Sequence, residues 1–268
     1  MHQGVRILFD LEKPTLKDRL AARRPVGVFW FALGSIALIE TAVAAGAEAV
    51  VIDMQHGLFD RLTLEAAIGA VPANVPCLVR VEDHSAAAIG RALDAGAEGL
   101  LIPLVETAEQ AAEVAAACHY PPVGQRSGGG VRPLRDFGAY RAVADRAITV
   151  GVMIETAKGA DNAAAIAAAE QVDFVFIGTG DLALSLGGKL GRTDGHAAAC
   201  AAIFEACTGA GKPCGTFTTS AEDAAARSAD GYWMTVVAND ISATRSAFDK
   251  AAATYSIERG AAPCTKRS

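Results

Sequence analysis

Two acidic residues, Glu155 and Asp181, each follow an apolar, β-branched segment of this chain of 268 residues. Glu155 ends the segment ITVGVMIE, and Asp181 comes directly after DFVFIGTG. Such segments are typical of buried parallel strands, and helix-like sequence follows each of them. In a barrel of alternating strands and helices, both carboxylates would lie at the C-terminal mouth, where active sites are built. Two carboxylates brought together repel each other unless a cation holds them, so the pair predicts a divalent metal site.

Further polar residues stand at the ends of other predicted strands. The second strand ends in a segment with Asp53, Gln55 and His56, and the third strand carries Arg80. Histidine is the side chain most often used for proton transfer, so His56 is a candidate, and Asp94 is the candidate for an acidic residue that orients its ring. Arg80 would stabilise a developing oxyanion. Each residue also has a structural alternative, such as a helix cap or an ordinary ion pair, but their convergence on one rim favours a functional site.

The predicted site supports enolate chemistry. Two carboxylate ligands leave positions on a metal for water and for a 2-oxo acid, which chelates through its carboxylate and keto oxygens. The metal then acts as a Lewis acid on the enolate that forms when a C3 proton leaves or a C3–C4 bond breaks. Mg2+, Mn2+ and Co2+ all suit hard oxygen ligands in a site with free coordination positions, so the sequence does not choose among these three metals.

The elements that must position these residues alternate along the chain. From Pro25 onward, Ala-rich helical sequence separates eight apolar strand candidates, at 26–32, 47–54, 76–82, 99–105, 148–155, 173–180, 213–218 and 231–238. Eight such units predict a (β/α)8 TIM barrel rather than an open sheet, and no dinucleotide or Walker fingerprint follows the first strand. We expect one barrel domain over residues 25–258, an N-terminal extension or helix over 1–24, and a frayed tail over 259–268.

The composition of the chain limits which binding partners and which cellular compartment we expect. A net charge of −6 argues against nucleic acid, and no uninterrupted apolar stretch is long enough to span a membrane. The N-terminus lacks the apolar core of a signal peptide. The cysteines show neither a CxxC pair nor zinc-ligand spacing, so we expect reduced thiols in a cytoplasmic protein. They are Cys77, Cys118, Cys200, Cys207, Cys214 and Cys264.

Several ordered motifs resemble the HpcH/HpaI aldolase family over roughly residues 15–250. They include AGAEAVVIDMQHG, LVRVEDHSAAAIGRALDAGAEGLLIPLVETAEQA, YPPVGQRS, VMIETAKGADNAAAIAAAEQVDFVFIGTGDLALSLG and MTVVANDISATR. The resemblance implies a class II, metal-dependent pyruvate aldolase on a (β/α)8 barrel. It also implies a homo-oligomer, a hexamer in which a C-terminal helix is exchanged between neighbouring subunits.

The resemblance assigns roles by motif position. Glu155 and Asp181 match the metal ligands, His56 the catalytic histidine, Asp94 its acidic partner, and Arg80 the enolate-stabilising arginine. The backbone amides of a segment after the sixth strand match the group that holds the pyruvate carboxylate. That segment comprises Gly178, Thr179, Gly180 and Asp181.

The chain also departs from the family pattern. Gln55 replaces the usual acidic residue of D-x-E-H-G, and Met153 stands where many members carry Gln. Thr179-Gly180 replaces Pro-Ala or Pro-Ser. These changes leave the metal and proton-transfer residues intact and leave the natural aldehyde acceptor open.

A Gly-rich segment, GQRSGGGVRP at 124–133, diverges from the family after Arg126. A long irregular loop of this kind is typical of an active-site cover or a disordered excursion. Arg126 and the run Gly128–Gly130 are therefore candidates for contacts with the acceptor, and a simple surface loop is the alternative.

The expected reaction is reversible aldol cleavage of a 4-hydroxy-2-oxo acid to pyruvate, or hydroxypyruvate, and an aldehyde. One alternative is a related metal-dependent lyase or decarboxylase that acts on an oxaloacetate-like acid or a CoA thioester. A Schiff-base aldolase would need a lysine inside a strand, whereas Lys158 and Lys212 lie only at predicted strand edges. A non-catalytic barrel is the remaining alternative.

Overall fold

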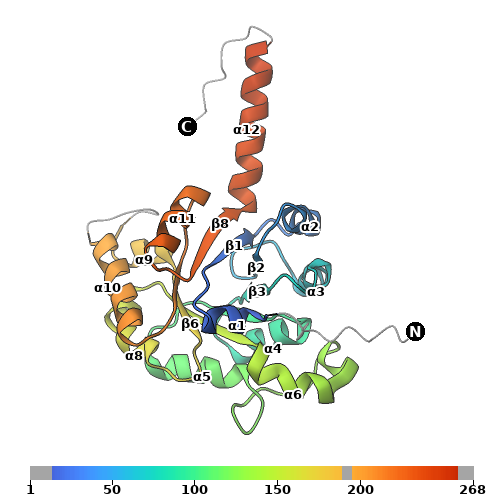
Figure 1. Cartoon of the computed structure of the whole chain (residues 1–268), viewed down its shortest axis with the longest axis vertical. Helices are drawn as coiled ribbons and strands as arrows, with labels where there is room; N and C mark the ends of the chain where they lie inside the picture. Colours follow the sequence, from blue (N-terminus) through green and yellow to red (C-terminus); the bar gives the residue numbers. More distant parts are fainter. Residues whose placement is uncertain (1–13, 189–194, 259–268) are drawn as a thin grey trace.

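Eight parallel strands close into a barrel in sequence order, which confirms the predicted (β/α)8 TIM barrel (Figure 1). The computed structural model describes residues 14–188 and 195–258, so the predicted tail at 259–268 lies outside the described residues. The strands are β1 Val26–Phe31, β2 Ala49–Asp53, β3 Cys77–Arg80, β4 Gly99–Ile102, β5 Thr149–Ile154, β6 Phe174–Ile177, β7 Cys214–Thr216 and β8 Met234–Asn239. β4 ends three residues earlier than the sequence indicates, because Pro103 has no N–H to donate to a neighbouring strand.

Most of the described helices follow the strands and pack around the barrel, whereas the first precedes β1 and the last projects away from the barrel (Figure 1). The helices are α1 Leu16–Ala21, α2 Ile36–Ala44, α3 Arg61–Ala70, α4 Ala86–Ala95, α5 Ala108–Cys118, α6 Phe137–Ala147, α7 Ala157–Asp161, α8 Ala163–Ala167, α9 Thr179–Ser185, α10 His196–Gly209, α11 Ala221–Ala229 and α12 Asp240–Glu258, with a 3-10 turn η1 at Pro133–Asp136. Many begin at a side-chain cap, such as Ser85 before α4 and Thr107 before α5. None of the described helices is long and apolar enough to cross a membrane.

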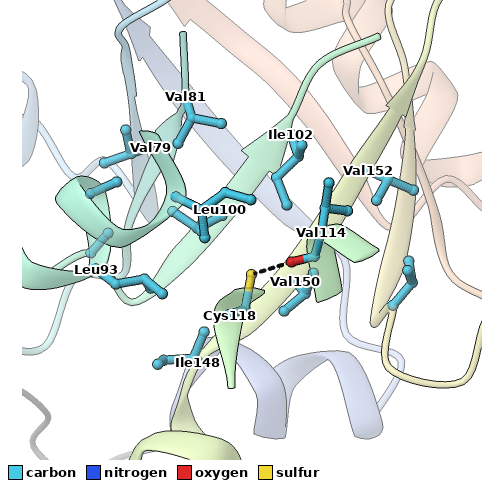
Figure 2. Close-up of a cluster of buried hydrophobic side chains, with 14 of the residues drawn as sticks. Val79, Val81, Leu93, Leu100, Ile102, Val114, Cys118, Ile148, Val150 and Val152 are labelled. Atoms are coloured by element: carbon cyan, nitrogen blue, oxygen red, sulfur yellow. Dashed lines mark hydrogen bonds between the residues drawn. The ribbon is translucent and has the colours of Figure 1, made fainter. Parts of the chain in front are cut away.

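The strands bury both faces because successive side chains point in opposite directions. One set packs outward against the helices, as Val79, Leu100 and Val150 do in Figure 2. The other set fills the barrel interior with large residues such as Phe174 and Phe176, both fully buried. This alternation explains the nearly continuous apolar character of each strand.

The helix α1 closes the N-terminal end of the barrel. Leu16 is fully buried in the interior, and its amide donates to Glu98 Oε1 at 2.7 Å. Lys17 donates to the carbonyl of Ile148 at 3.0 Å and pairs with Asp173 at 3.1 Å. These partners directly precede β4, β5 and β6, so the open mouth is the C-terminal end of the barrel.

The helix α12 leaves the barrel and projects away from it (Figure 1). Its apolar residues Ile241, Phe248 and Ile257 are exposed. Asp240 at its start is buried, and its carboxylate accepts hydrogen bonds from the amides of Ala32 and Leu33 at 2.8 to 3.1 Å. The foot of α12 therefore holds the loop that follows β1.

Gly90 in the middle of α4 offers a stability test away from the mouth. A Cβ at this position would meet nothing within 4 Å. Replacing glycine in a helix interior with alanine reduces the backbone entropy lost on folding, so Gly90→Ala should stabilise the fold by about 0.5–1 kcal/mol. Urea unfolding followed by circular dichroism should show a higher midpoint at an unchanged slope; a lower midpoint would contradict the expected packing.

Candidate active site at the C-terminal mouth of the barrel

The side chains of Asp53, Arg80 and Glu155 belong to the inward-facing set of their strands. Each stands two positions after a residue whose side chain packs inside the barrel, and each comes where its strand ends. All three are nevertheless less than one-tenth exposed. The strand periodicity therefore gathers these charged groups at the mouth, as the sequence analysis expects.

Glu155 is the most enclosed charged group of the site. Its side chain is 1% exposed, and Oε1 accepts a hydrogen bond from the amide of Leu104 at 2.8 Å. Oε2 is buried, and nothing in residues 14–188 and 195–258 donates a hydrogen bond to it. Burial raises the pKa of Glu155 to about 7; the Leu104 amide lowers the pKa and the nearby charge of Asp181 raises it further. A buried, unpartnered carboxylate oxygen beside a second carboxylate fits a divalent cation.

Leu104 is held in an unusual conformation to reach Glu155. Its φ of 57° lies in the left-handed region, which non-glycine residues rarely adopt. The adjacent Pro103 ends β4, and the chain then turns so that the Leu104 amide points at the carboxylate. Strain of this kind costs about 1–3 kcal/mol and concentrates at functional sites.

Gly178 lets the chain after β6 pass close to Glu155. A Cβ at Gly178 would lie 2.2 Å from Glu155 Oε2 and 2.7 Å from Glu155 Cβ. The amide of Gly178 donates to the carbonyl of Ile154 at 3.1 Å, which ties the two strand ends together. Asp181 lies in the first turn of α9, with Thr179 and Gly180 before it, and all three are partly buried.

Asp53 organises the opposite side of the mouth. Its Oδ1 accepts from Arg80 Nε at 2.9 Å, and its Oδ2 is bonded by Arg80 Nη2 and, at 3.2 Å, by Trp30 Nε1. The Arg80 guanidinium also lies over the Trp30 ring, 5.1 Å from its centroid. Burial raises the pKa of the Asp53 carboxyl, but the hydrogen bonds and charge of Arg80 hold it below its usual range. Arg80 is thus fixed in place and stays close enough to Glu155 for its charge to lower the pKa of that carboxyl.

The same aspartate shapes the turn that carries His56. Asp53 Oδ1 accepts from the amides of Gln55 at 3.0 Å and His56 at 3.2 Å. His56 is exposed at the mouth, whereas Met153 is buried in the barrel interior. The structure therefore brings Asp53, Gln55 and His56 to the rim that also holds Glu155.

Asp94 and Arg126 do not join this rim within one chain. The helix α4 starts after β3 and runs back toward the start of β4, so Asp94 near its last turn lies at the N-terminal end of the barrel. There Asp94 pairs with Arg126 at 3.1 Å, and Arg126 donates to Tyr140 Oη at 2.9 Å. Asp94 is predicted to be the acidic partner of His56, but a single chain does not bring the two side chains together.

The Gly-rich segment 124–133 follows α5 and packs at the same N-terminal end. The carboxylate of Asp94 lies so close to Gly130 that a Cβ there would come within 2.6 Å of Asp94 Cγ. Within one chain this placement does not bring the segment over the mouth, so it favours the surface-loop alternative over an active-site cover. The physical reason is its position after a helix, which returns the chain to the opposite end of the barrel.

Two residues that contribute to the site, Trp30 and Leu104, are not predicted from the sequence. Trp30 lies two positions after the inward-facing Val28 in β1, so strand alternation could have found it. Leu104 acts through its backbone amide, and an apolar side chain gives no chemical signal in the sequence.

The chain has clear relatives of known family. It matches the model of the HpcH/HpaI aldolase/citrate lyase family over residues 26–247. It is 35% identical over 245 residues to the 5-keto-4-deoxy-D-glucarate aldolase of Salmonella newport, a match that covers 89% of this chain and 95% of that protein. It is 40% identical over 163 residues to the 4-hydroxy-2-oxovalerate aldolase of Novosphingobium aromaticivorans. That second match covers 59% of this chain and 62% of the relative, less than two thirds of its length.

Solved structures share the fold. An HpcH/HpaI aldolase/citrate lyase family protein from Burkholderia cenocepacia superposes with a TM-score of 0.80 at 32% identity, covering 88% of this chain and 98% of that one. The citrate synthase SbnG superposes with a TM-score of 0.82 at 29% identity, covering 92% and 99%. The likeness to both extends over the whole barrel.

Proposed function

Because this chain belongs to the HpcH/HpaI aldolase/citrate lyase family, we propose that it catalyses reversible aldol cleavage of a 4-hydroxy-2-oxo acid. The products are pyruvate, or hydroxypyruvate, and an aldehyde. The observation that carries the proposal is the buried, unpartnered Oε2 of Glu155, which lies within electrostatic range of Asp181, Arg80 and Asp53. The named relatives, which are aldolases, support the same carbon–carbon lyase class.

Glu155 and Asp181 are the residues that would hold a divalent cation. Both offer hard oxygen ligands, which suit Mg2+, Mn2+ or Co2+. When bound, such a cation supplies Lewis-acid polarisation of the keto group of a 2-oxo acid. The strained Leu104 amide fixes one oxygen of Glu155 and leaves the other without a hydrogen-bond partner among the described residues.

The remaining residues would orient the substrate and move its protons. Arg80, fixed by its hydrogen bonds to Asp53 and its contact with the Trp30 ring, would place a permanent positive charge where enolate oxygen charge develops. His56 stands exposed on the same rim and is suited to proton transfer. The amides of the segment 178–181 would hold the carboxylate of the 2-oxo acid. Since Asp94 lies at the other end of its own barrel, its partnership with His56 would require a second copy of the chain.

A homo-oligomer fits the exposed surface of α12. This helix presents Ile241 and Phe248 to solvent, seven residues apart and therefore on one face, and it projects beyond the barrel (Figure 1), so it offers an apolar face to a neighbouring subunit. A hexamer with an exchanged helix is the assembly that we propose from the family resemblance. Analytical ultracentrifugation should then report a mass well above that of one chain.

Proton exchange at C3 of pyruvate tests the proposed chemistry without needing the natural aldehyde. With added Mn2+ or Mg2+ in deuterated water, the methyl signal of pyruvate should disappear from the proton NMR spectrum. Treatment with EDTA should stop this exchange, and returning the metal should restore it. Exchange that survives EDTA, together with a covalent adduct trapped by borohydride, would replace the metal site with Schiff-base chemistry. None of the described strands carries a lysine.

Arg80→Lys tests whether the fixed guanidinium matters beyond its charge. Lysine keeps the positive charge but cannot make both hydrogen bonds to Asp53 and the ring contact with Trp30. We expect kcat/KM for the cleavage reaction to fall by about a hundredfold or more, as for the loss of an oxyanion donor. A value within threefold of the parent enzyme would remove Arg80 from the proposed role.

The likeness to a citrate synthase favours one second candidate, a related reaction of an oxaloacetate-like acid or a CoA thioester. The same enolate chemistry would serve both reactions, so the site geometry does not separate them. Incubation with acetyl-CoA and oxaloacetate, followed by detection of free thiol, distinguishes the two. Thiol release faster than pyruvate–aldehyde turnover would favour the second candidate.

A further inference from the structure

His196 makes a buried hydrogen bond to the start of the helix that carries Asp181. The His196 ring is 7% exposed, and its Nε2 lies 2.9 Å from the carbonyl oxygen of Thr179. A carbonyl oxygen can only accept, so Nε2 must carry the hydrogen and donate it. His196 begins α10, and Thr179 begins α9, so this bond links the first turns of two helices.

The bond matters because α9 is short and carries a proposed metal ligand. The helix has seven residues, and Asp181 lies two positions after Thr179. At its other end, Ser185 Oγ accepts from the amide of Ala157 at 2.9 Å. The buried Leu182 anchors its middle. The bond from His196 therefore anchors the end of α9 that faces the mouth.

The hydrogen bond between His196 and Thr179 borders a cavity, so close packing does not hold α9 in place on that side. This cavity, of about 340 Å3, is lined by residues that include Thr179, His196, Cys200, Thr216 and Phe217. Cys200 lies within 3.7 Å of the same His196 nitrogen, and a thiol is a weak acceptor. With open volume alongside, the first turn of α9 can shift if the donor is lost.

We propose that His196 is a positioning residue that holds the proposed metal ligand Asp181 in place through the carbonyl of Thr179. This inference rests on the proposed metal-dependent function. Partners that orient a metal ligand in this way typically change metal affinity or activity by about 10- to 100-fold when they are removed.

A matched pair of substitutions distinguishes the effect of losing the hydrogen-bond donor of His196 from the effect of changing the volume of its side chain. His196→Gln places an amide donor near the position of Nε2, whereas His196→Leu fills a similar volume without a donor. We expect His196→Leu to weaken Mn2+ binding, measured by calorimetry, by about tenfold or more, and His196→Gln to restore most of the affinity. Hydrogen exchange of the metal-free protein should quicken in the segment 178–185 for His196→Leu and stay slow for His196→Gln.

A substitution elsewhere in α10 is the control for a general loss of protein stability. Ile203 is fully buried in α10 about two turns after His196, so Ile203→Val should lower the melting temperature without changing Mn2+ affinity. Equal Mn2+ affinity in His196→Leu and the parent protein would overturn the inference. Equal losses in His196→Leu and His196→Gln would overturn it too. A parent protein that binds no Mn2+ would instead overturn the proposed function.

Discussion

Glu155→Gln should abolish metal-dependent turnover, with kcat/KM falling by about a thousandfold or more. The amide keeps the size of the side chain but removes the negative charge that interacts with Asp181. Mn2+ titration followed by calorimetry should show that the affinity falls together with the rate. Turnover close to that of the parent enzyme would exclude Glu155 as a metal ligand.

The same substitution should stabilise the metal-free protein at alkaline pH. Burial raises the pKa of Glu155 to about 7 from an ordinary 4.5, so the folded chain keeps this proton while the unfolded chain loses it. Stability therefore falls as the pH rises through this range, and above it the ionised group costs about 3 kcal/mol. Glutamine has no such charge, so with EDTA its melting temperature should exceed that of the parent protein at pH 8.

The pH profile is the internal control for that gain. Below the ordinary pKa of 4.5, the carboxyl is protonated in both the folded and the unfolded states, so the advantage of glutamine should vanish. A gain of the same size at acidic and alkaline pH would mean that packing, rather than the buried charge, distinguishes the two side chains.

Gly178→Ala should disable the metal site by adding a single methyl group. The new Cβ would lie 2.2 Å from Glu155 Oε2 and 2.7 Å from Glu155 Cβ, both well inside contact distance. Glu155 is 1% exposed and has no room to retreat, so the carboxylate must turn away from its bond to Leu104. We expect Mn2+ affinity and kcat/KM to fall by at least about a hundredfold.

Gly90→Ala provides the matched control for this substitution. It adds the same methyl group in a helix, where nothing lies within 4 Å of the new carbon, and should leave activity unchanged. If Gly178→Ala retains Mn2+ affinity, Glu155 and Gly178 are not packed as described. If both variants lose activity equally, a general effect of the substitution would account for the loss.

The barrel could be predicted from sequence because its determinants are local. Alternating apolar strands and Ala-rich helices define eight units, and the closed parallel sheet confirms them. The positions of Asp53, Arg80 and Glu155 also follow from sequence, since the strand period of two turns all three inward. The predicted family and enzyme class are confirmed by the matching family model and the named aldolases.

What sequence could not supply depends on contacts between distant segments. The Asp94–Arg126 pair and the packing of Gly130 against Asp94 arise from the return of α4 and α5 to one end of the barrel. The left-handed turn at Leu104 and the bond from His196 to Thr179 involve a backbone amide and a backbone carbonyl. Backbone groups occur at every residue, so their use leaves no pattern in the sequence.

Because the carboxylate of Asp240 is buried and bonded, the peptide bond after Asp240 is a natural place to shorten the chain. On its N-terminal side, Asp240 secures the amides of Ala32 and Leu33, and so the loop that leads out of the strand carrying Trp30. On its C-terminal side, α12 is a projecting rod (Figure 1). A chain shortened after Asp240 would keep the hydrogen bonds that hold the loop after β1, while losing the surface by which copies could assemble. Shortening the chain by one residue more would also release that loop, so the effect of assembly on activity can be measured apart from the effect of this loop.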